Sequence, residues 1–190
     1  MLVSKILLVI ATTFSVAFAE YGCGEVNVVY TLVYSITDEQ AVFFNLNMYL
    51  SGLPGRHKYV KEQGADPILT EKQIADHMRE MREAGYNVRG IWRGPEINGS
   101  QFAENVQGVD WHAAGVGFGI RGSNISELTG LLEENLAIYR EEAPDAKFVF
   151  NYSPLSFLWS VQRYFPLSSN CKDHPGKDLG FITLCDEACS

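Results

Sequence analysis

Apolar and polar positions along the chain follow two different periods, which separate predicted strands from predicted helices. Residues 26–36 are rich in Val, Tyr, Thr and Leu, a composition typical of a strand. Asp38 then caps a predicted helix, in which apolar residues recur at helical spacing from Val42 to Leu53. Glycines, prolines and charges between positions 51 and 67 predict a long loop.

A helix followed directly by a strand is predicted next. Thr70 and Gln73 have the spacing of a capping box, in which each side chain satisfies a free backbone donor. Gly85 predicts the end of this helix through a left-handed cap, and residues 88–92 predict the strand. The apolar stripe of the helix consists of Ile74, Met78 and Met81.

The same plan recurs further along the chain. Residues 116–120 alternate apolar side chains with glycine and predict a strand with one bare face. Ser123 or Asn124 caps the next predicted helix, and Pro144 marks its end. Two more elements are predicted, a strand over 147–151 and a short apolar helix over 155–165.

This order of elements predicts an α/β two-layer sandwich. The leading architecture is a ferredoxin-like βαββαβ arrangement with extra helices, in which one sheet carries its helices on one face. A mixed sheet with helices on both faces is the alternative.

The amino terminus has the pattern of a cleaved secretory signal. Lys5 precedes an apolar stretch, and the small residues Ala17 and Ala19 occupy the positions that a signal peptidase reads. The apolar run ends at Glu20, which makes it shorter than the ~20 residues of a membrane-spanning helix. We therefore predict a signal peptide over 1–19, no membrane span, and a single secreted, extracellular α/β domain over 20–190.

Four cysteines follow the predicted cleavage site: Cys23, Cys171, Cys185 and Cys189. An even number in an oxidising compartment predicts two disulfides with three possible pairings, and each pairing ties Cys23 to the carboxyl-terminal tail. The alternative is a zinc site, because Cys171 and His174 are followed by Cys185 and Cys189 at a spacing that resembles that of zinc ligands. Zinc would leave Cys23 unpaired, so we predict disulfides and no metal.

The charge of the chain bears on its partners, and its sequons bear on its glycosylation. The formal net charge is −8, and the basic residues form no stripe that could neutralise a phosphate backbone, so nucleic acid is not an expected partner. Asn98 and Asn124 each begin an N-x-[ST] sequon and are predicted glycosylation sites. The sequon at Asn151 follows a predicted strand and precedes a proline, which makes it the least favourable of the three.

Candidate chemistry is concentrated between positions 96 and 112. Asp110 beside His112 could orient the imidazole as a general base, with Glu96 as a further acid/base group. Residues 117–122 match G-x-G-x-x-G, but the first two glycines fall inside the predicted strand, and the acidic partner of a dinucleotide site is missing. No cofactor is therefore expected.

These observations favour an extracellular protein that binds a protein partner or small ligand and is not an enzyme. The first alternative is a secreted hydrolase that uses Glu96, Asp110 and His112. A second alternative is a carrier of apolar ligands lined by the aromatic residues between positions 148 and 165.

Overall fold

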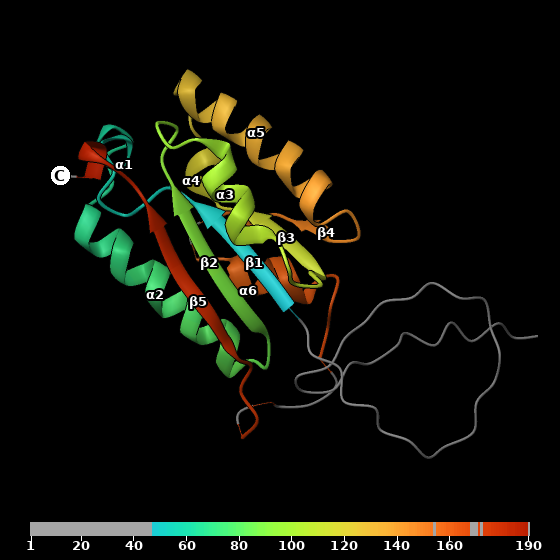
Figure 1. Cartoon of the computed structure of the whole chain (residues 1–190). Coiled ribbons are helices and arrows are strands. Elements are labelled where there is room, and N and C mark those ends of the chain that lie inside the picture. The colour runs from blue at the N-terminus through green and yellow to red at the C-terminus, as the bar shows by residue number, and fades with distance from the viewer. Residues whose placement is uncertain (1–46, 154, 168–170, 172, 190) are drawn as a thin grey trace, which may run out of the picture.

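A computed structural model describes residues 47–153, 155–167, 171 and 173–189. These residues form one sheet with helices on both of its faces (Figure 1). The predicted signal peptide, the strand over 26–36 and Cys23 lie outside the described residues.

All strand pairings in the described part of the chain are parallel. The sheet has five strands in the order β4-β3-β1-β2-β5, so β1 is central and β4 and β5 form the edges. Parallel strands place all of their carboxyl ends at the same edge of the sheet. The strands are β1 (Asn47–Gly52), β2 (Asn87–Arg93), β3 (Ala113–Val116), β4 (Lys147–Val149) and β5 (Asp178–Leu184).

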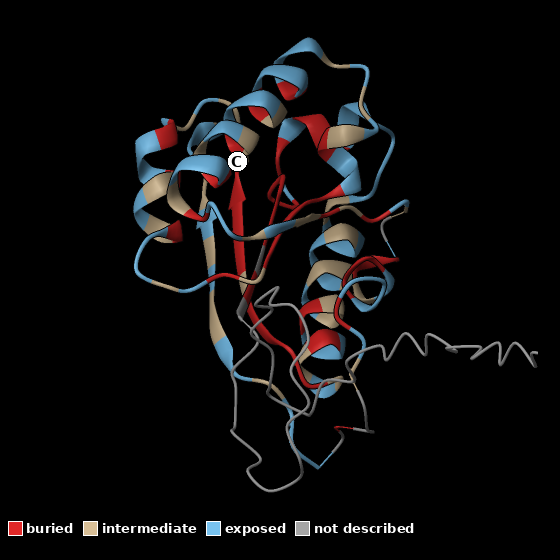
Figure 2. Cartoon of the chain, turned by 90° about the vertical axis from the view of Figure 1, so that its right-hand side faces the viewer, coloured by how far each residue is buried: buried red, intermediate tan, exposed pale blue. Residues whose placement is uncertain are grey.

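The helices divide between the two faces of the sheet. One face packs against α2 and α6, and the other packs against α3 and α5. Each face has its own apolar core, and Figure 2 shows the helices with their exposed sides turned away from the buried strands. The helices are α1 (Lys58–Glu62), α2 (Pro67–Glu83), α3 (Gly99–Val106), α4 (Phe118–Arg121), α5 (Ser126–Glu142), α6 (Phe157–Gln162) and the 3₁₀ turn η1 (Glu187–Cys189).

The predicted α/β class is confirmed, whereas the ferredoxin-like topology is not. A ferredoxin-like sheet has antiparallel neighbours and one helical layer, but here every described pairing is parallel and both faces are covered. The alternative arrangement correctly placed helices on both faces. Its mixed sheet does not agree with the parallel pairing, which extends to β5 in a tail where the sequence predicted no strand.

Two segments differ in type from their predictions. The predicted helix over 42–53 is wrong for Asn47–Gly52, which form the central strand β1. The apolar residues of β1 are the short run Met48–Leu50, and so short a run does not distinguish a buried strand from a buried helix by its period. The predicted glycine strand is also wrong beyond Val116, because Gly117 leaves the sheet and begins the short helix α4.

Most of the remaining boundaries agree within a few residues. Helix α2 begins earlier than predicted because the Asp66 side chain caps it, accepting a hydrogen bond from Leu69 N at 2.8 Å. Gly85 ends the helix with a φ of +101°, as predicted from its position. None of the helices in the described ranges is long and apolar enough to cross a membrane.

Candidate ligand-binding pocket

The order of the strands produces a crevice at the carboxyl edge of the sheet. The chain leaves β1 toward β2 on one side and leaves β3 toward β4 on the other, so the loops after β1 and β3 diverge. Such a switch point is the usual position of a ligand site in an open α/β sheet.

A cavity of about 270 Å³ lies at this switch point. Its lining is mainly apolar, and among the described lining residues none is Asp, Glu, Lys or Arg. The lining residues come from the ends of β1 and β2, the turn after β3, the segment after β4, and helices α1, α2, α4 and α6 with the residues beside them. They are Gly52, Leu53, Val60, Gln63, Ala65, Thr70, Gln73, Ile74, His77, Trp92, Gly117, Phe118, Gly119, Asn151 and Phe157.

Trp92 contributes an aromatic surface to the cavity and is itself only 3 % exposed. Two glycines make room for its indole on the sheet. A Cβ atom at Gly90 would lie 2.0 Å from Trp92 Cζ3, and one at Gly52 would lie 3.2 Å from Trp92 Nε1. On its other side the indole stacks on Phe181 of β5, with ring centroids 4.6 Å apart. The position of Trp92 therefore depends on residues of three adjacent strands.

The turn after β3 is held against the end of β1. Gly117 N donates to Ser51 O at 2.7 Å, after which the chain turns into α4. A Cβ atom at Gly117 would lie 3.3 Å from Ser51 O, so glycine allows this close approach. The turn thereby brings Gly117, Phe118 and Gly119 to the cavity.

Arg121 joins the ends of β3 and β4. Its Nε donates to Val116 O at 3.0 Å, and its Nη2 donates to the backbone oxygen and to Oδ1 of Asn151. Burial lowers the pKa of the Arg121 guanidinium below its ordinary value. Asn151 lines the cavity and Arg121 does not, so Arg121 acts on the cavity by positioning the polar side chain of Asn151.

One face of α2 forms a wall of the cavity. Thr70, Gln73, Ile74 and His77 have the i, i+3, i+4, i+7 spacing of a single helical face, and all four line the cavity. Gln73 and His77 contribute polar groups among apolar neighbours.

His77 is held on two sides. Its side chain is 12 % exposed, and Nδ1 lies 3.2 Å from Glu80 Oε2 one turn along the helix. Its ring lies 5.7 Å from the ring of Phe157 on α6. Nε2 is buried and has no hydrogen-bond partner among the described residues.

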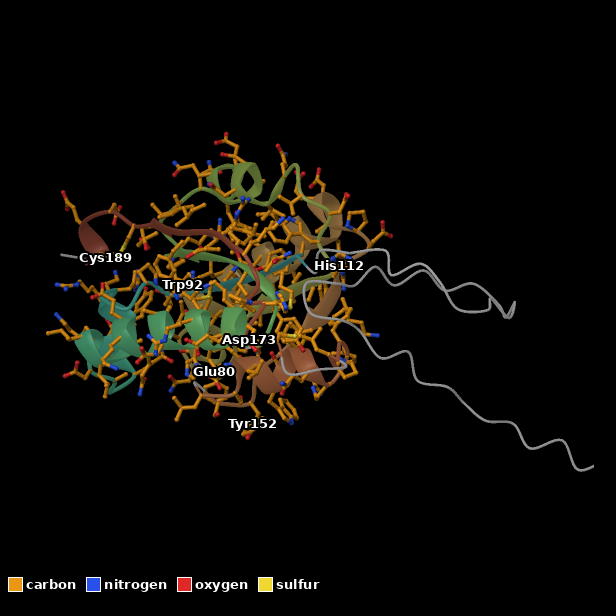
Figure 3. The ribbon with its side chains drawn as sticks, turned by 90° about the horizontal axis from the view of Figure 1, so that it is seen from below. Glu80, Trp92, His112, Tyr152, Asp173 and Cys189 are labelled. Atoms are coloured by element: carbon orange, nitrogen blue, oxygen red, sulfur yellow. A yellow bond between two sulfur atoms is a disulfide. The ribbon has the colours of Figure 1, made fainter. Side chains whose placement is uncertain are left out.

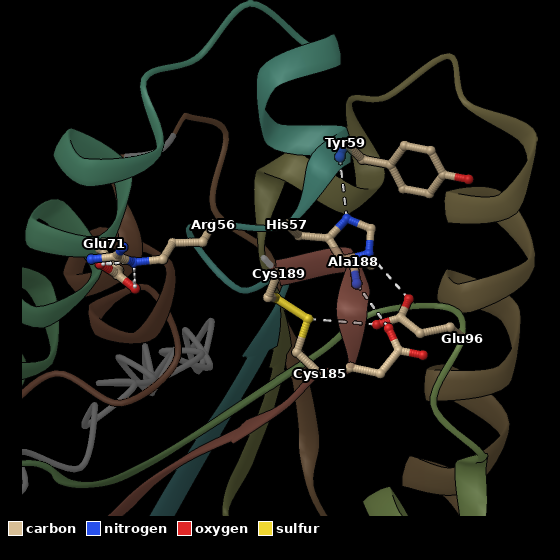
Figure 4. Close-up of a disulfide and its surroundings, with 9 residues drawn as sticks. Arg56, His57, Tyr59, Glu71, Glu96, Cys185, Ala188 and Cys189 are labelled. Atoms are coloured by element: carbon tan, nitrogen blue, oxygen red, sulfur yellow. Dashed lines mark hydrogen bonds and ion pairs between the residues drawn. A yellow bond between two sulfur atoms is a disulfide. The ribbon is translucent and has the colours of Figure 1, made fainter.

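Glu96, one of the predicted acid/base residues, lies at the carboxyl edge of the sheet beside His57 (Figure 4). His57 Nδ1 accepts from Tyr59 N at 3.2 Å, so the other nitrogen, Nε2, donates to Glu96 Oε2 at 3.1 Å. Glu96 Oε1 lies 3.6 Å from the sulfur of Cys185. That sulfur belongs to a disulfide and has no proton to donate, so the contact is a packing contact.

Asp110 and His112 lie at the other end of the sheet. They precede β3 directly, and His112 O accepts from Lys147 N at the start of β4 at 2.9 Å. Figure 3 shows His112 far from Cys189, which lies on the side of Glu96. The fold therefore keeps Asp110 and His112 together at the amino edge but does not bring Glu96 to them.

The described cysteines are in disulfides and not in a zinc site. Cys185 and Cys189 form a disulfide with Cα atoms 6.1 Å apart, so both sulfurs are unavailable to the alternative zinc site. Cys171 is also disulfide-bonded.

Asn98 is exposed and caps α3, with its side chain accepting from Ser100 N at 2.9 Å. Asn124 is exposed as well, and Asn151 is only 2 % exposed. No group of three or more His, Cys, Asp or Glu residues in the described segments could hold a metal ion.

No known protein family, characterised protein or solved structure matches this chain.

Of the residues that line this cavity, only Phe157 is among the aromatic residues that the sequence offered as a ligand lining. The sequence pattern placed Gly117 and Gly119 inside a strand and assigned no site role to His77, although the structure puts all three at the cavity. The available signal was the helical spacing of Thr70, Gln73, Ile74 and His77, where polar side chains recur on the same face as an apolar one.

Proposed function

We propose that this chain is a secreted, disulfide-bonded α/β domain over 20–190 that binds a small, neutral and mainly apolar molecule at the carboxyl ends of β1 and β3. The observation that carries the proposal is the cavity of about 270 Å³ at the switch point of a parallel sheet. The signal-peptide pattern of residues 1–19 supports secretion.

The residue types that line the cavity favour a neutral ligand over a charged one. A charged ligand would lose its hydration and would need an opposite charge, and the described lining residues include no carboxylate, ammonium or guanidinium group. Trp92, Phe118 and Phe157 offer aromatic surface, which suits a flat apolar group. Gln63, Gln73 and Asn151 can fix its orientation through hydrogen bonds.

The positions of the acid/base residues favour binding over the hydrolase alternative. Glu96 is engaged by His57, and Asp110 and His112 lie at the opposite edge of the sheet. A general base has to be within hydrogen-bond reach of the group that it deprotonates, so these three residues do not serve one substrate. The carrier alternative is closer to the geometry, because Phe157 of the aromatic segment lines the cavity.

The proposal is tested by titrating toluene and anisole into the disulfide-bonded protein and following backbone amide shifts by NMR. We expect saturable shifts that centre on Gly52, Trp92 and Gly117. Gln73→Trp places a large ring on the cavity wall and should abolish these shifts. Ala75→Trp, at an exposed position on the same helix that does not line the cavity, should leave them unchanged. Shifts absent from the wild type, or unchanged in Gln73→Trp, would contradict the proposal.

A further inference from the structure

The outward side of α6 and the loop before it carry large apolar and aromatic side chains that do not line the cavity. Tyr152 and Leu155 are 64 % and 65 % exposed, and Trp159 and Tyr164 are 43 % and 38 % exposed. Tyr152 lies at the periphery of the molecule (Figure 3). Large apolar side chains that are exposed together mark an interaction site. We call these four residues, together with Lys147 and Arg163, the α6 surface.

Contacts between rings and cations make the α6 surface continuous. The rings of Tyr152 and Trp159 meet edge to face, with centroids 4.8 Å apart. Arg163 Cζ lies 4.3 Å from the centroid of the Trp159 ring and 4.8 Å from that of Tyr164. On the far side of this group, Lys147 Nζ lies 4.7 Å from the centroid of the Tyr164 ring. Residues from β4, from the loop after it and from α6 therefore contribute to one surface.

The charge of this segment is opposite in sign to that of the whole chain, whose formal net charge is −8. The sequence has no Asp or Glu between Asp145 and Asp173, and the charged residues within that stretch are Lys147, Arg163 and Lys172. The glutamates of α5 belong to the other face of the sheet. On α2, which packs against α6, every acidic side chain contacts a basic one. The α6 surface is therefore locally cationic.

Phospholipid headgroups fit this combination of side chains better than a protein partner does. Trp and Tyr concentrate at membrane interfaces because each has an apolar body and a polar tip. Arg and Lys pair with the phosphate groups of anionic lipids. Protein surfaces carry charges of both signs and are matched by interfaces that do the same, whereas a layer of phosphates repels every carboxylate. A stretch with cations and without Asp or Glu therefore favours phosphates.

We propose that the α6 surface binds the interface of an anionic phospholipid membrane. Leu155 and Trp159 enter the headgroup region, and Lys147 and Arg163 contact the phosphates. The contact is peripheral, because α6 (Phe157–Gln162) is far shorter than a membrane-spanning helix. This surface is separate from the cavity, so the inference does not depend on the proposed function.

Sedimentation of the disulfide-bonded protein with vesicles tests the apolar part of the contact. Vesicles of equal parts phosphatidylcholine and phosphatidylglycerol should bind the wild type. Leu155→Ser should weaken this binding about 5- to 10-fold, because a leucine side chain is no longer withdrawn from water. Ile68→Ser, which removes a 70 % exposed apolar side chain from α2, is the matched control and should leave binding unchanged.

The cationic part is tested with the same vesicles. Arg163→Gln should weaken binding about 5-fold, whereas Arg140→Gln, at an exposed position on α5, should not change it. Vesicles of phosphatidylcholine alone should bind the wild type at least about 5-fold more weakly than the mixed vesicles, because they carry no net negative charge. Equal binding to the two kinds of vesicle would overturn the assignment of an anionic lipid.

Trp159 reports the contact without any substitution. The other two tryptophans, Trp92 and Trp111, are only 3 % and 5 % exposed, so brominated lipid in the mixed vesicles should quench the emission of Trp159. Trp159→Phe should remove this quenching. Absence of vesicle binding in the wild type, or equal effects of Leu155→Ser and Ile68→Ser, would overturn the inference. A concentration-dependent dimer in place of vesicle binding, abolished by Leu155→Ser, would overturn it in favour of a second copy of the chain.

Discussion

His57 and Glu96 form a hydrogen bond of 3.1 Å between Nε2 and Oε2, although 39 positions separate them in the sequence. The His57 side chain is fully buried, while that of Glu96 is 22 % exposed. The other ring nitrogen accepts from Tyr59 N, so both nitrogens of His57 are in use. The pair ties the loop after β1 to the loop after β2, beside the disulfide of the carboxyl-terminal tail.

Glu96→Ala is predicted to lower the stability of the fold without removing binding at the cavity. The substitution leaves the buried Nε2–H of His57 without an acceptor, which costs about 1–3 kcal/mol. Urea unfolding followed by circular dichroism measures this cost, and Glu104→Ala, at an exposed carboxylate on α3, is the control. Unchanged stability together with loss of anisole binding would instead give Glu96 a direct role in the site.

Substitutions of Arg93 and Glu134 are predicted to lower the stability of the fold by different amounts. Arg93 is fully buried at the end of β2, and its Nη2 pairs with Glu134, whose side chain is 47 % exposed. Nε and Nη1 of Arg93 have no hydrogen-bond partner in the described ranges. Glu134→Ala leaves a buried guanidinium without its counter-charge and should cost about 3–5 kcal/mol.

Arg93→Met should cost clearly less than Glu134→Ala, because Glu134 can remain hydrated once its partner is gone and the methionine fills the buried volume. Chemical unfolding of both variants beside the wild type makes the comparison. A larger loss of stability for Arg93→Met than for Glu134→Ala would contradict this account of the pair.

Alkaline pH is predicted to destabilise the fold through two buried tyrosines. Burial raises the pKa values of Tyr86 and Tyr139 above their usual value of 10.0. Tyr86 Oη donates to Phe165 O at 2.6 Å, and Tyr139 Oη lies 2.5 Å from Ser51 Oγ. The folded state therefore keeps protons that the unfolded state loses, so stability is complete below pH 10 and decreases as the pH rises above it.

Phenolate absorbance measured against pH tests this prediction. The two tyrosines should ionise only together with the unfolding transition seen by circular dichroism, and Tyr86→Phe and Tyr139→Phe should each remove one phenol from that coupled step. Complete tyrosine ionisation before unfolding would show that neither hydroxyl is protected.

The helix–strand units of the fold could be predicted from sequence because their signals are local. The stripe of α2, its stop at Gly85 and the following strand β2 all depend on residues close together in the chain. The parallel topology could not be predicted, since the short apolar run Met48–Leu50 of β1 fits a buried strand and a buried helix equally well. The tail strand β5 pairs with β2 across some 90 positions, for which no local signal exists.

The candidate site was harder to predict than the fold. Glu96, Asp110 and His112 lie close together in sequence, but β2 and β3 run parallel, so the segment between them starts at the carboxyl edge and ends at the amino edge. The cavity instead combines residues as distant as Gly52 and Phe157, whose meeting depends on the order of the strands. Orphan polar atoms such as His77 Nε2 become visible only once the packing is known.

A crystal structure of the disulfide-bonded protein under xenon pressure is the most direct test of the central claim, because xenon enters apolar cavities. The account predicts xenon density between Trp92, Phe157 and Ile74 in the wild type, and loss of that density in Gln73→Trp. A wild-type structure in which side chains fill this space, with xenon bound elsewhere or not at all, would contradict it.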